Sequence, residues 1–282
     1  VSSDTITGTS TTYDATDVIA DNSTTDNDTL TVTASGDIGA LAQIINVENV
    51  NFTLESFTAT GTTSDAILEV AADNIQNFTV MNIDLNKVGS GISSATVTGL
   101  ETGSNVVFTD DFTTAVIVTG DDNAALTATS KAASMTANSG GTLTGATLTS
   151  TSATAATMVS DSDAAVNLTT TVADMIIQAA TATTAVATSA GSIDANTADL
   201  TAATSVTLTA TDEVNVGLEA ATTATISAGG TTASTIDDAL GNTLTSLSLS
   251  GNGTAHEFSL LNSEGVSSVT ITGDQNVTVT MD

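Results

Sequence analysis

Short runs in which apolar and polar residues alternate recur along almost the whole chain. In residues 268–282, SVTITGDQNVTVTMD, two such runs flank a Gly-Asp turn. Successive runs keep a similar spacing, as from Val206 to Val214 and from Phe258 to Val269. Alternation with a period of two is typical of strands, and the β-branched residues Val, Ile and Thr favour them. The sequence therefore predicts an all-β fold made of short strands at a nearly constant pitch.

Two architectures contain many short strands, the sandwich and the solenoid. Hairpin turns such as Asn-Gly are nearly absent between the runs, with Asn252-Gly253 as the exception. We therefore expect a right-handed parallel β-solenoid, or β-helix, in which two or three strands make a coil of roughly 20–30 residues. In the final stretch we expect threonines to point outward and four apolar residues to point inward: Val269, Ile271, Val277 and Val279.

The pattern divides the chain into two parts. Residues 1–28 are polar and rich in turn-forming residues, which predicts an irregular N-terminal cap or linker. Residues 29–282 carry the strand pattern and form the predicted solenoid. Within it, alanine replaces many bulky residues over about 124–240, which predicts narrow coils with a small core. The expected inward residues of this narrow part are Leu126, Met135, Leu143, Leu148, Met158, Leu168, Met175 and Ile177.

Almost all charged residues of the chain are acidic. Lys87 and Lys131 are the only lysines, arginine is absent, and 32 carboxylates give a formal net charge of −30. Such a surface repels phosphate backbones and anionic headgroups, which argues against nucleic-acid binding and membrane association. No apolar run of about 18 residues suggests a membrane-inserted helix. The absence of cysteine excludes disulfides and thiolate metal sites and suits an extracellular protein.

The sequence lacks the residue sets of common enzymes. Polysaccharide lyases on parallel β-helices normally use Lys or Arg, and glycosidases combine two carboxylates with aromatic sugar platforms. Here arginine is absent and aromatic residues make up 2% of the chain. His256 is the only histidine, so neither a catalytic histidine pair nor a histidine-based zinc site can be built. We expect His256 to be a surface or strand-edge residue, and we expect the protein not to be an enzyme.

Carboxylates cluster in several of the expected turns. Ca²⁺ takes six to eight oxygen ligands, and stacked coils can bring the acidic turns of neighbouring coils together. Repulsion among the carboxylates also disfavours a compact fold, and divalent cations relieve it. We predict irregular Ca²⁺ sites, because the Gly-Gly-x-Gly-x-Asp repeat is absent. The preferred ligands are Asp21, Asp26, Asp28, Asp110, Asp111, Asp121 and Asp122, and two further acidic pairs are Asp161 with Asp163 and Asp237 with Asp238.

Thr-x-Thr pairs form a further pattern. They occur, for example, at Thr207 and Thr209 and at Thr270 and Thr272. Flat ladders of such pairs are used by ice-binding solenoids, but threonine is also a common exposed β-branched residue. The pairs are spread along the sequence without an evident common register, so ice binding is a minor alternative.

The composition of five stretches points to a group of surface proteins. The stretches are GTSTTYDATDVIADNSTTDNDTLTV, IINVENVNFTL, SVTLTATDEVNV, LTSLSLSGNG and SVTITGDQNVTVT. They resemble RTX-type S-layer proteins and large adhesins that Gram-negative, Caulobacter-like bacteria export by type I secretion. The resemblance implies a β-solenoid that assembles edge to edge into a Ca²⁺-dependent sheet or fibre on the cell surface. The glycine-rich nonapeptide array of that family is missing here and residue 1 is valine, so we expect a processed chain or a piece of a longer one.

These observations together predict a self-assembling structural protein. We expect an S-layer or extracellular-matrix subunit on the surface of a Gram-negative bacterium, stabilised by Ca²⁺. The expected partners are further copies of the chain, in a lattice or filament, and a cell-surface polysaccharide. The main alternative is the stalk or ligand-binding module of a biofilm adhesin. A carbohydrate-active β-helix enzyme with two carboxylates in an acidic groove is another alternative.

Overall fold

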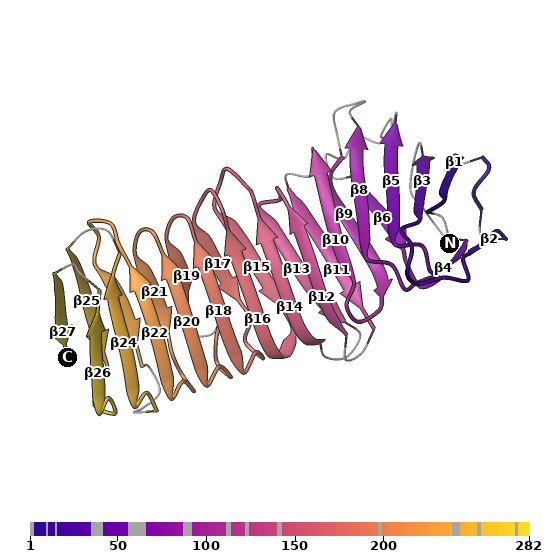
Figure 1. Cartoon of the computed structure of the whole chain (residues 1–282). Coiled ribbons are helices and arrows are strands. Elements are labelled where there is room, and N and C mark those ends of the chain that lie inside the picture. The colour runs from indigo at the N-terminus through magenta and orange to yellow at the C-terminus, as the bar shows by residue number, and fades with distance from the viewer. Residues whose placement is uncertain are drawn as a thin grey trace. The chain divides into compact units, whose positions relative to one another are not determined.

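The structure, a computed structural model, consists of strands and turns (Figure 1). It describes residues 3–9, 11–14, 16–34, 42–55, 66–86, 92–110, 114–121, 124–139, 143–196, 199–238, 243–252, 255–273 and 276–282. None of these residues is helical, so no described segment is a helix that could cross a membrane. Neighbouring strands pair in parallel wherever the pairing is defined, as between β1 and β3 or β25 and β27. The predicted all-β parallel solenoid is confirmed.

The chain divides into two compact units, Val1–Leu143 and Thr144–Asp282. The strands of the first unit are β1 (Thr5–Thr9), β2 (Val18–Ala20), β3 (Thr29–Ala34), β4 (Gln43–Ile45), β5 (Asn49–Glu55), β6 (Ala66–Ala71), β7 (Ile75–Gln76), β8 (Val80–Asn86), β9 (Ile92–Leu100), β10 (Asn105–Asp110), β11 (Ala115–Gly120), β12 (Ala125–Ser130) and β13 (Ser134–Ser139). Three parallel sheets run through this unit, in the orders β1-β3-β5-β8-β10-β12, β6-β9-β11-β13 and β2-β4-β7.

The second unit is more regular. Its strands are β14 (Leu143–Ser150), β15 (Ala156–Ser160), β16 (Ser162–Thr170), β17 (Met175–Gln178), β18 (Thr184–Ser189), β19 (Ile193–Ala195), β20 (Ser205–Ala210), β21 (Val214–Gly217), β22 (Thr223–Ala228), β23 (Ser234–Asp237), β24 (Ser246–Gly251), β25 (His256–Leu261), β26 (Ser268–Thr272) and β27 (Val277–Met281). The chain alternates between two sheets, because even-numbered strands stack in one and odd-numbered strands in the other (Figure 1).

Each coil brings a strand into register with the equivalent strand of the coil before it. Thr5 pairs with Thr29 in the first unit, and Ser205 pairs with Thr223 in the second. The sequence separation of the first pair lies within the coil length expected from the strand pitch, and that of the second pair is slightly shorter than expected. Because the register is kept from coil to coil, side chains of the same face form columns that run across the sheets.

Large side chains fill the core of the first unit. One column in register contains Leu30, Val50, Met81 and Val106, and the next contains Val32, Phe52, Ile83 and Phe108. All of these residues are buried. Fully burying such a side chain contributes about 1.5–3 kcal/mol, so the columns are a main source of stability.

The core narrows in the second unit. Ala185 pairs with Val206 and Ala187 pairs with Leu208, so in both columns a small side chain stacks against a larger one of the next coil. Ala185 and Ala187 are each 1% exposed, so alanine here is a core residue. The eight inward residues expected between Leu126 and Ile177 are all buried, which confirms that they face the core.

A ladder of hydroxyl groups ties one corner of the second unit together. Its members are Thr183, Thr204, Thr222, Thr245 and Ser267. From Thr204 onward, each side-chain hydroxyl and each backbone N–H donates to the carbonyl of the member one coil earlier, at 2.9–3.2 Å. Threonine and serine at this corner therefore add one hydrogen bond per coil to the backbone ladder.

Residues 1–28 contain two strands. β1 pairs with β3 over five residues, and β2 pairs with β4 over three. Tyr13 lies between them, 9% exposed, with its ring 6.5 Å from that of Phe52. Burial, assisted by the nearby carboxylate of Asp17, raises the pKa of the Tyr13 hydroxyl well above its usual range.

The last two strands continue the inward columns, but several of their core-facing side chains are exposed. Val269 and Ile271 pair with the buried residues Leu247 and Leu249, yet they are 38% and 54% exposed. They face the same side as the core, as predicted, but no described coil covers them. Met281 is likewise exposed, although its partner Leu260 is buried.

Candidate metal site

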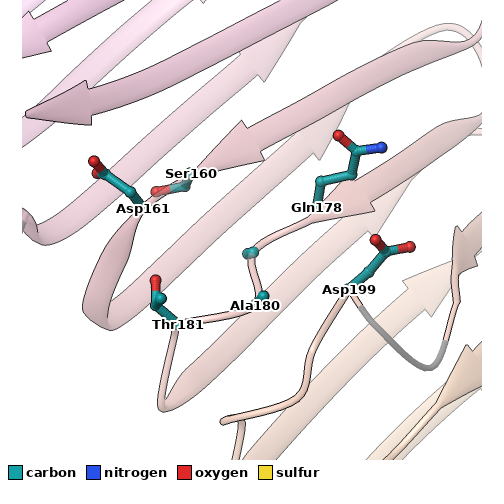
Figure 2. Close-up of a pocket in the computed structure, with 7 residues that line it drawn as sticks. Ser160, Asp161, Gln178, Ala180, Thr181 and Asp199 are labelled. Carbon is teal, nitrogen blue, oxygen red and sulfur yellow. The ribbon is translucent and has the colours of Figure 1, made fainter.

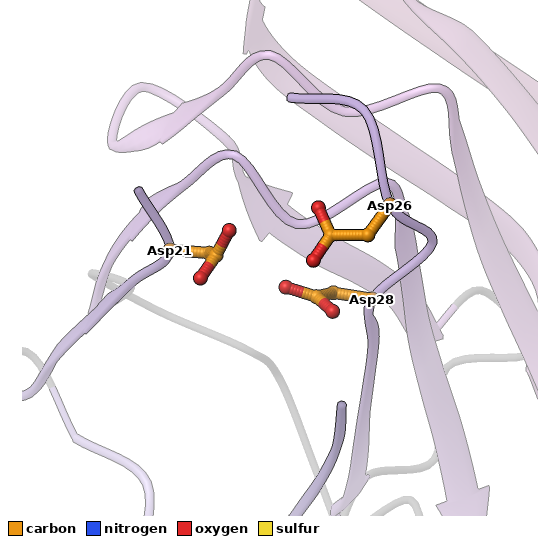
Figure 3. Close-up of side chains that lie close together, drawn as sticks. All are labelled: Asp21, Asp26 and Asp28. Atoms are coloured by element: carbon orange, nitrogen blue, oxygen red, sulfur yellow. The ribbon is translucent and has the colours of Figure 1, made fainter. Parts of the chain in front are cut away.

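Three aspartates meet where the first unit turns from β2 into β3. β2 ends at Ala20 and Asp21 follows it directly, whereas Asp26 and Asp28 precede β3. The loop folds back, so that one carboxylate oxygen from each aspartate lies within 4.8 Å of the others. Figure 3 shows the three carboxylates pointing toward one another. No other such group of acidic or histidine side chains occurs among the described residues.

Asp28 is the most deeply buried of the three, at 2% exposed. Its Oδ1 accepts a hydrogen bond of 2.8 Å from the backbone N–H of Asp4, in the preceding coil. Its own N–H donates to Oε2 of Glu48, in the following coil, also at 2.8 Å. Asp28 is therefore fixed in position by contacts with both neighbouring coils.

Asp26 has an unusual environment for a carboxylate. Both of its oxygens are inaccessible to solvent, and neither has a hydrogen-bond partner among the described residues. A buried charge without compensation is costly, so buried carboxylates are normally paired, hydrogen-bonded or bound to a metal. The only charged groups close to these oxygens in the cluster are two further carboxylates, which make the cost higher.

Asp238 shows how the same fold satisfies a buried aspartate without an ion. It is 1% exposed, and its carboxylate accepts hydrogen bonds from the backbone N–H of Leu244 and the hydroxyl of Thr243. Its neighbour Asp237 accepts a bond of 2.8 Å from the side-chain amide of Asn262. The pair Asp237 and Asp238 is therefore a structural turn element, in contrast to Asp26.

Asp21 closes the third side of the cluster. Its carboxylate accepts a hydrogen bond from the N–H of Ser23, and its backbone carbonyl accepts one of 2.9 Å from the side chain of Asn46. Asn46 adopts a left-handed conformation at φ 57°, which suits asparagine at a tight corner. The corner of the next coil therefore holds the loop that carries Asp21.

The three carboxylates could together bind one metal ion. All of the donors are hard anionic oxygens, without a nitrogen or sulfur ligand, as alkaline-earth ions prefer. An ion among them would supply the positive charge that the oxygens of Asp26 lack. The loop thus brings three carboxylates close together. One of them, that of Asp26, is buried and has no compensating group among the described residues.

The other predicted ligands do not form a cluster in the part of the chain that the structure describes. Asp111 and Asp122 lie outside the described residues, as does the side chain of Asp110. Asp121 is exposed after β11, and its N–H donates to the carbonyl of Leu100. The calcium prediction for Asp110, Asp111, Asp121 and Asp122 therefore stays a prediction.

Two backbone-linked residues of the metal site were not singled out from the sequence. Asp4 lies one coil before Asp28, and Glu48 lies one coil after it. A search for acidic residues one coil apart would have found both.

A hollow of about 210 Å³ lies in the second unit and contains two carboxylates (Figure 2). Asp161 and Asp199 line it together with Gln178 and Thr181. Two carboxylates are the minimum for glycoside hydrolysis. However, Asp199 accepts a hydrogen bond of 2.8 Å from the backbone N–H of Asn196, which indicates a turn-stabilising role.

A second hollow, of about 410 Å³, lies over the outward face of four strands of the first unit, β3, β5, β8 and β10. The residues that line it all carry polar groups and include Asn51, Asn82, Asp84 and Thr109. The Asn82 amide donates to Oδ1 of Asn51 at 2.7 Å, and the Thr109 hydroxyl donates to Asp84 at 2.9 Å. The surface offers amide, hydroxyl and carboxylate groups to a polar ligand.

The expectation for His256 was wrong. The residue is 4% exposed and lies on β25, which pairs with strands on both sides. Its ring packs edge-on against Phe258, with the ring centroids 4.8 Å apart, and its Nε2 contacts the Oγ of Ser234. The alternation of HEFSL places His256 and Phe258 on the same inward face, a signal that was available in the sequence.

The hydroxyl residues of the second unit also share a register, contrary to the impression from the sequence. Together with Val186, their side chains form three outward columns across β18, β20, β22, β24 and β26. The columns are Thr184-Ser205-Thr223-Ser246-Ser268, Val186-Thr207-Thr225-Ser248-Thr270 and Thr188-Thr209-Ser227-Ser250-Thr272. None of these five strands contains a charged residue, although the chain carries 32 carboxylates.

Comparison with known proteins gives no assignment. No protein-family model matches the chain, and neither a curated protein nor a solved structure is significantly similar to it.

Proposed function

We propose that this chain is a structural β-solenoid of an extracellular assembly, an S-layer or matrix subunit stabilised by Ca²⁺. The observation that carries the proposal is the buried carboxylate of Asp26, which has no hydrogen-bond partner among the described residues and faces Asp21 and Asp28. An ion with several open coordination positions satisfies such a group, and Ca²⁺ accepts six to eight oxygens in flexible geometry. Mg²⁺ fits less well, because it demands near-ideal octahedral geometry and keeps several waters.

The composition and the fold support a structural role. The net charge of −30 favours the binding of divalent cations. It disfavours the binding of nucleic acids, because their phosphate backbones are also negatively charged. The compositional resemblance to RTX-type S-layer proteins supports assembly with further copies at the surface of a Gram-negative bacterium. In such an assembly the ion would hold coils together against mutual repulsion of the carboxylates.

Calorimetric titration of the full chain with Ca²⁺ tests the metal site. We expect saturable binding of Ca²⁺ at one strong site and weaker binding of Mg²⁺. At 100 times the dissociation constant, Ca²⁺ should stabilise the fold by about 2.7 kcal/mol against thermal unfolding. Asp26→Asn should abolish both effects, because it removes the uncompensated charge.

Asp194→Asn is the matched control, since it makes the same change in net charge at an exposed position on β19. It should leave strong Ca²⁺ binding intact. Equal losses in Asp26→Asn and Asp194→Asn would mean that Ca²⁺ acts only by screening the acidic surface, and the site would be rejected.

Negative-stain electron microscopy with Ca²⁺ and after chelation tests the assembly. A lattice or filament subunit should form regular arrays with Ca²⁺ and lose them in chelator. The adhesin alternative, for which the polar hollow around Asn51 and Asn82 offers a ligand surface, predicts monomers in both conditions. Arrays that persist after chelation would contradict the Ca²⁺-dependent part of the proposal.

Ice binding is a second candidate function, favoured by the common register of the hydroxyl columns. The hydroxyls repeat at about 4.8 Å between strands and about 6.6 Å along them. A surface that is periodic in two directions and uncharged is suited to an ordered lattice of water. Thermal hysteresis and inhibition of ice recrystallisation measure this activity directly.

The variant Thr207→Glu together with Thr225→Glu should remove any ice activity, since it puts charge at the centre of the columns. Thr235→Glu, on a half-buried position of the other sheet, is the control and should keep it. Absence of activity in the unmodified chain would reject this second function without affecting the calcium proposal.

A further inference from the structure

The metal loop is connected by hydrogen bonds to the outermost described strand of its sheet. Among the described strands, β1 comes first in the order β1-β3-β5 and pairs with β3. Asp4, just before β1, is held at two points: its carbonyl accepts the N–H of Thr29 at 2.9 Å, and its N–H donates to Oδ1 of Asp28 at 2.8 Å. The carboxylate of Asp28 therefore fixes the start of β1.

The same carboxylate belongs to the metal cluster. A carboxylate has two oxygens and can accept a backbone hydrogen bond on one while it binds an ion through the other. Without an ion, Asp28 faces the carboxylates of Asp21 and Asp26 within 4.8 Å. Like charges at this distance repel, and a buried carboxylate without a partner adds to the cost of the closed arrangement.

We infer that Ca²⁺ at Asp21, Asp26 and Asp28 controls the pairing of β1 with β3, so that the ion works as a clamp on the edge coil. The inference rests on the calcium site proposed above and adds a conformational role to it. The second observation behind it, besides the cluster itself, is Asp26, whose two solvent-inaccessible oxygens lack any described partner.

Glu48 is the positioning residue of the clamp. Its Oε2 accepts the N–H of Asp28, and the N–H of Asn49 donates to the carbonyl of Asp28 at 3.0 Å. These contacts hold the backbone of Asp28 from the side of β5. Its carboxylate is thereby positioned to accept the N–H of Asp4 at the start of β1. Three consecutive coils, represented by Asp4, Asp28 and Glu48, are thus joined at one point.

Hydrogen exchange of the full chain, with and without Ca²⁺, tests the clamp. Exchange of the β1 amides should slow about 100-fold at a Ca²⁺ concentration 100 times the dissociation constant, since the closed state alone binds the ion. Exchange in β18 and β20, in the second unit, should not change. Asp26→Asn should abolish the Ca²⁺-dependent slowing.

Variants at Glu48 separate positioning from general destabilisation. Glu48→Gln keeps an oxygen acceptor for the N–H of Asp28 and should retain the Ca²⁺ response of β1. Glu48→Ala loses the acceptor and should weaken Ca²⁺ binding and the response of β1 together. Equal Ca²⁺ affinity and equal β1 protection in all three proteins would overturn the positioning role.

The outcomes distinguish this inference from the proposed site. Stoichiometric Ca²⁺ binding without any change in β1 exchange would overturn the clamp and leave the calcium site intact. Failure of the unmodified chain to bind Ca²⁺ in calorimetry would overturn both. Slowing of β1 exchange that persists in Asp26→Asn would show that the ion acts elsewhere, and the clamp would again be rejected.

Discussion

The Oγ of Ser234 lies 2.8 Å from Nε2 of His256, and both side chains are buried in the second unit. The same Oγ accepts the backbone N–H of Val214 at 2.8 Å. One hydroxyl thus serves two groups from two other strands, β21 and β25. The other ring nitrogen of His256 has no hydrogen-bond partner among the described residues, so Ser234 is the main polar support of this histidine.

Ser234→Ala should destabilise the protein by about 1–3 kcal/mol, because the N–H of Val214 and the ring of His256 both lose a buried partner. The free energy of unfolding in urea measures the effect. Ser248→Ala, on the half-exposed outward face of β24, is the control and should change stability by less than about 0.5 kcal/mol. Equal effects of the two substitutions would contradict the buried hydrogen-bond network.

The corner ladder gives a second prediction. Thr222→Val keeps the shape of the side chain but removes the hydroxyl that donates to the carbonyl of Thr204 at 3.2 Å. We expect a loss of about 0.5–1.5 kcal/mol in unfolding free energy. Thr225→Val, at an exposed outward position of β22, should cost less than half as much. A smaller effect at Thr222 than at Thr225 would exclude the ladder as a source of stability.

The narrow core is tested by enlarging an alanine. Ala185 is 1% exposed and pairs with Val206, so Ala185→Leu should overpack the coil and cost about 1–3 kcal/mol. Its neighbour Val186 is 37% exposed on the outward face, and Val186→Leu should be nearly neutral. Thermal unfolding of both variants compares the two faces of one strand. Tolerance of leucine at residue 185 would indicate a wider interior than the structure has.

Alkaline pH should weaken the first unit through Tyr13. Burial and the carboxylate of Asp17 raise the pKa of its hydroxyl in the folded state. Above about pH 10 the unfolded chain releases this proton while the folded chain keeps it, so the unfolding free energy falls as pH rises. The unfolding free energy should fall by up to about 1.4 kcal/mol per pH unit in this range. Tyr13→Phe should remove this pH-dependent loss of stability. Parallel pH profiles for the two proteins would contradict the burial of the hydroxyl.

The strand pattern predicted the architecture because period-two alternation reports which side chains face the core. The inward residues from Leu126 to Ile177 were predicted one by one, and all are buried. The same alternation places His256 on the inward face, although histidine is more often found at the surface than fully buried. For Val269 and Ile271 the sequence predicted the face, whereas exposure depended on the lack of a covering coil in the described structure.

The metal cluster was partly visible in the sequence. Asp21, Asp26 and Asp28 lie in one acidic loop, so their proximity is local. However, the sequence did not show that these three carboxylates, and not those of another acidic turn, would come together. The satisfied carboxylate of Asp238 and the unsatisfied one of Asp26 look equivalent in the sequence. The difference between them depends on backbone N–H groups that only the folded turn brings within reach.

The sequence by itself determined the class of fold and the identity of most core residues, because alternation of Val, Ile, Leu and Ala with Thr and Ser is a local property. Tertiary structure decided which residues of successive coils become neighbours. It set the register that aligns Thr207 with Thr225, and it connected Asp28 to Asp4 and Glu48. The physical reason is that coil length varies from turn to turn, so only the closed hydrogen-bond ladder determines which residues become neighbours.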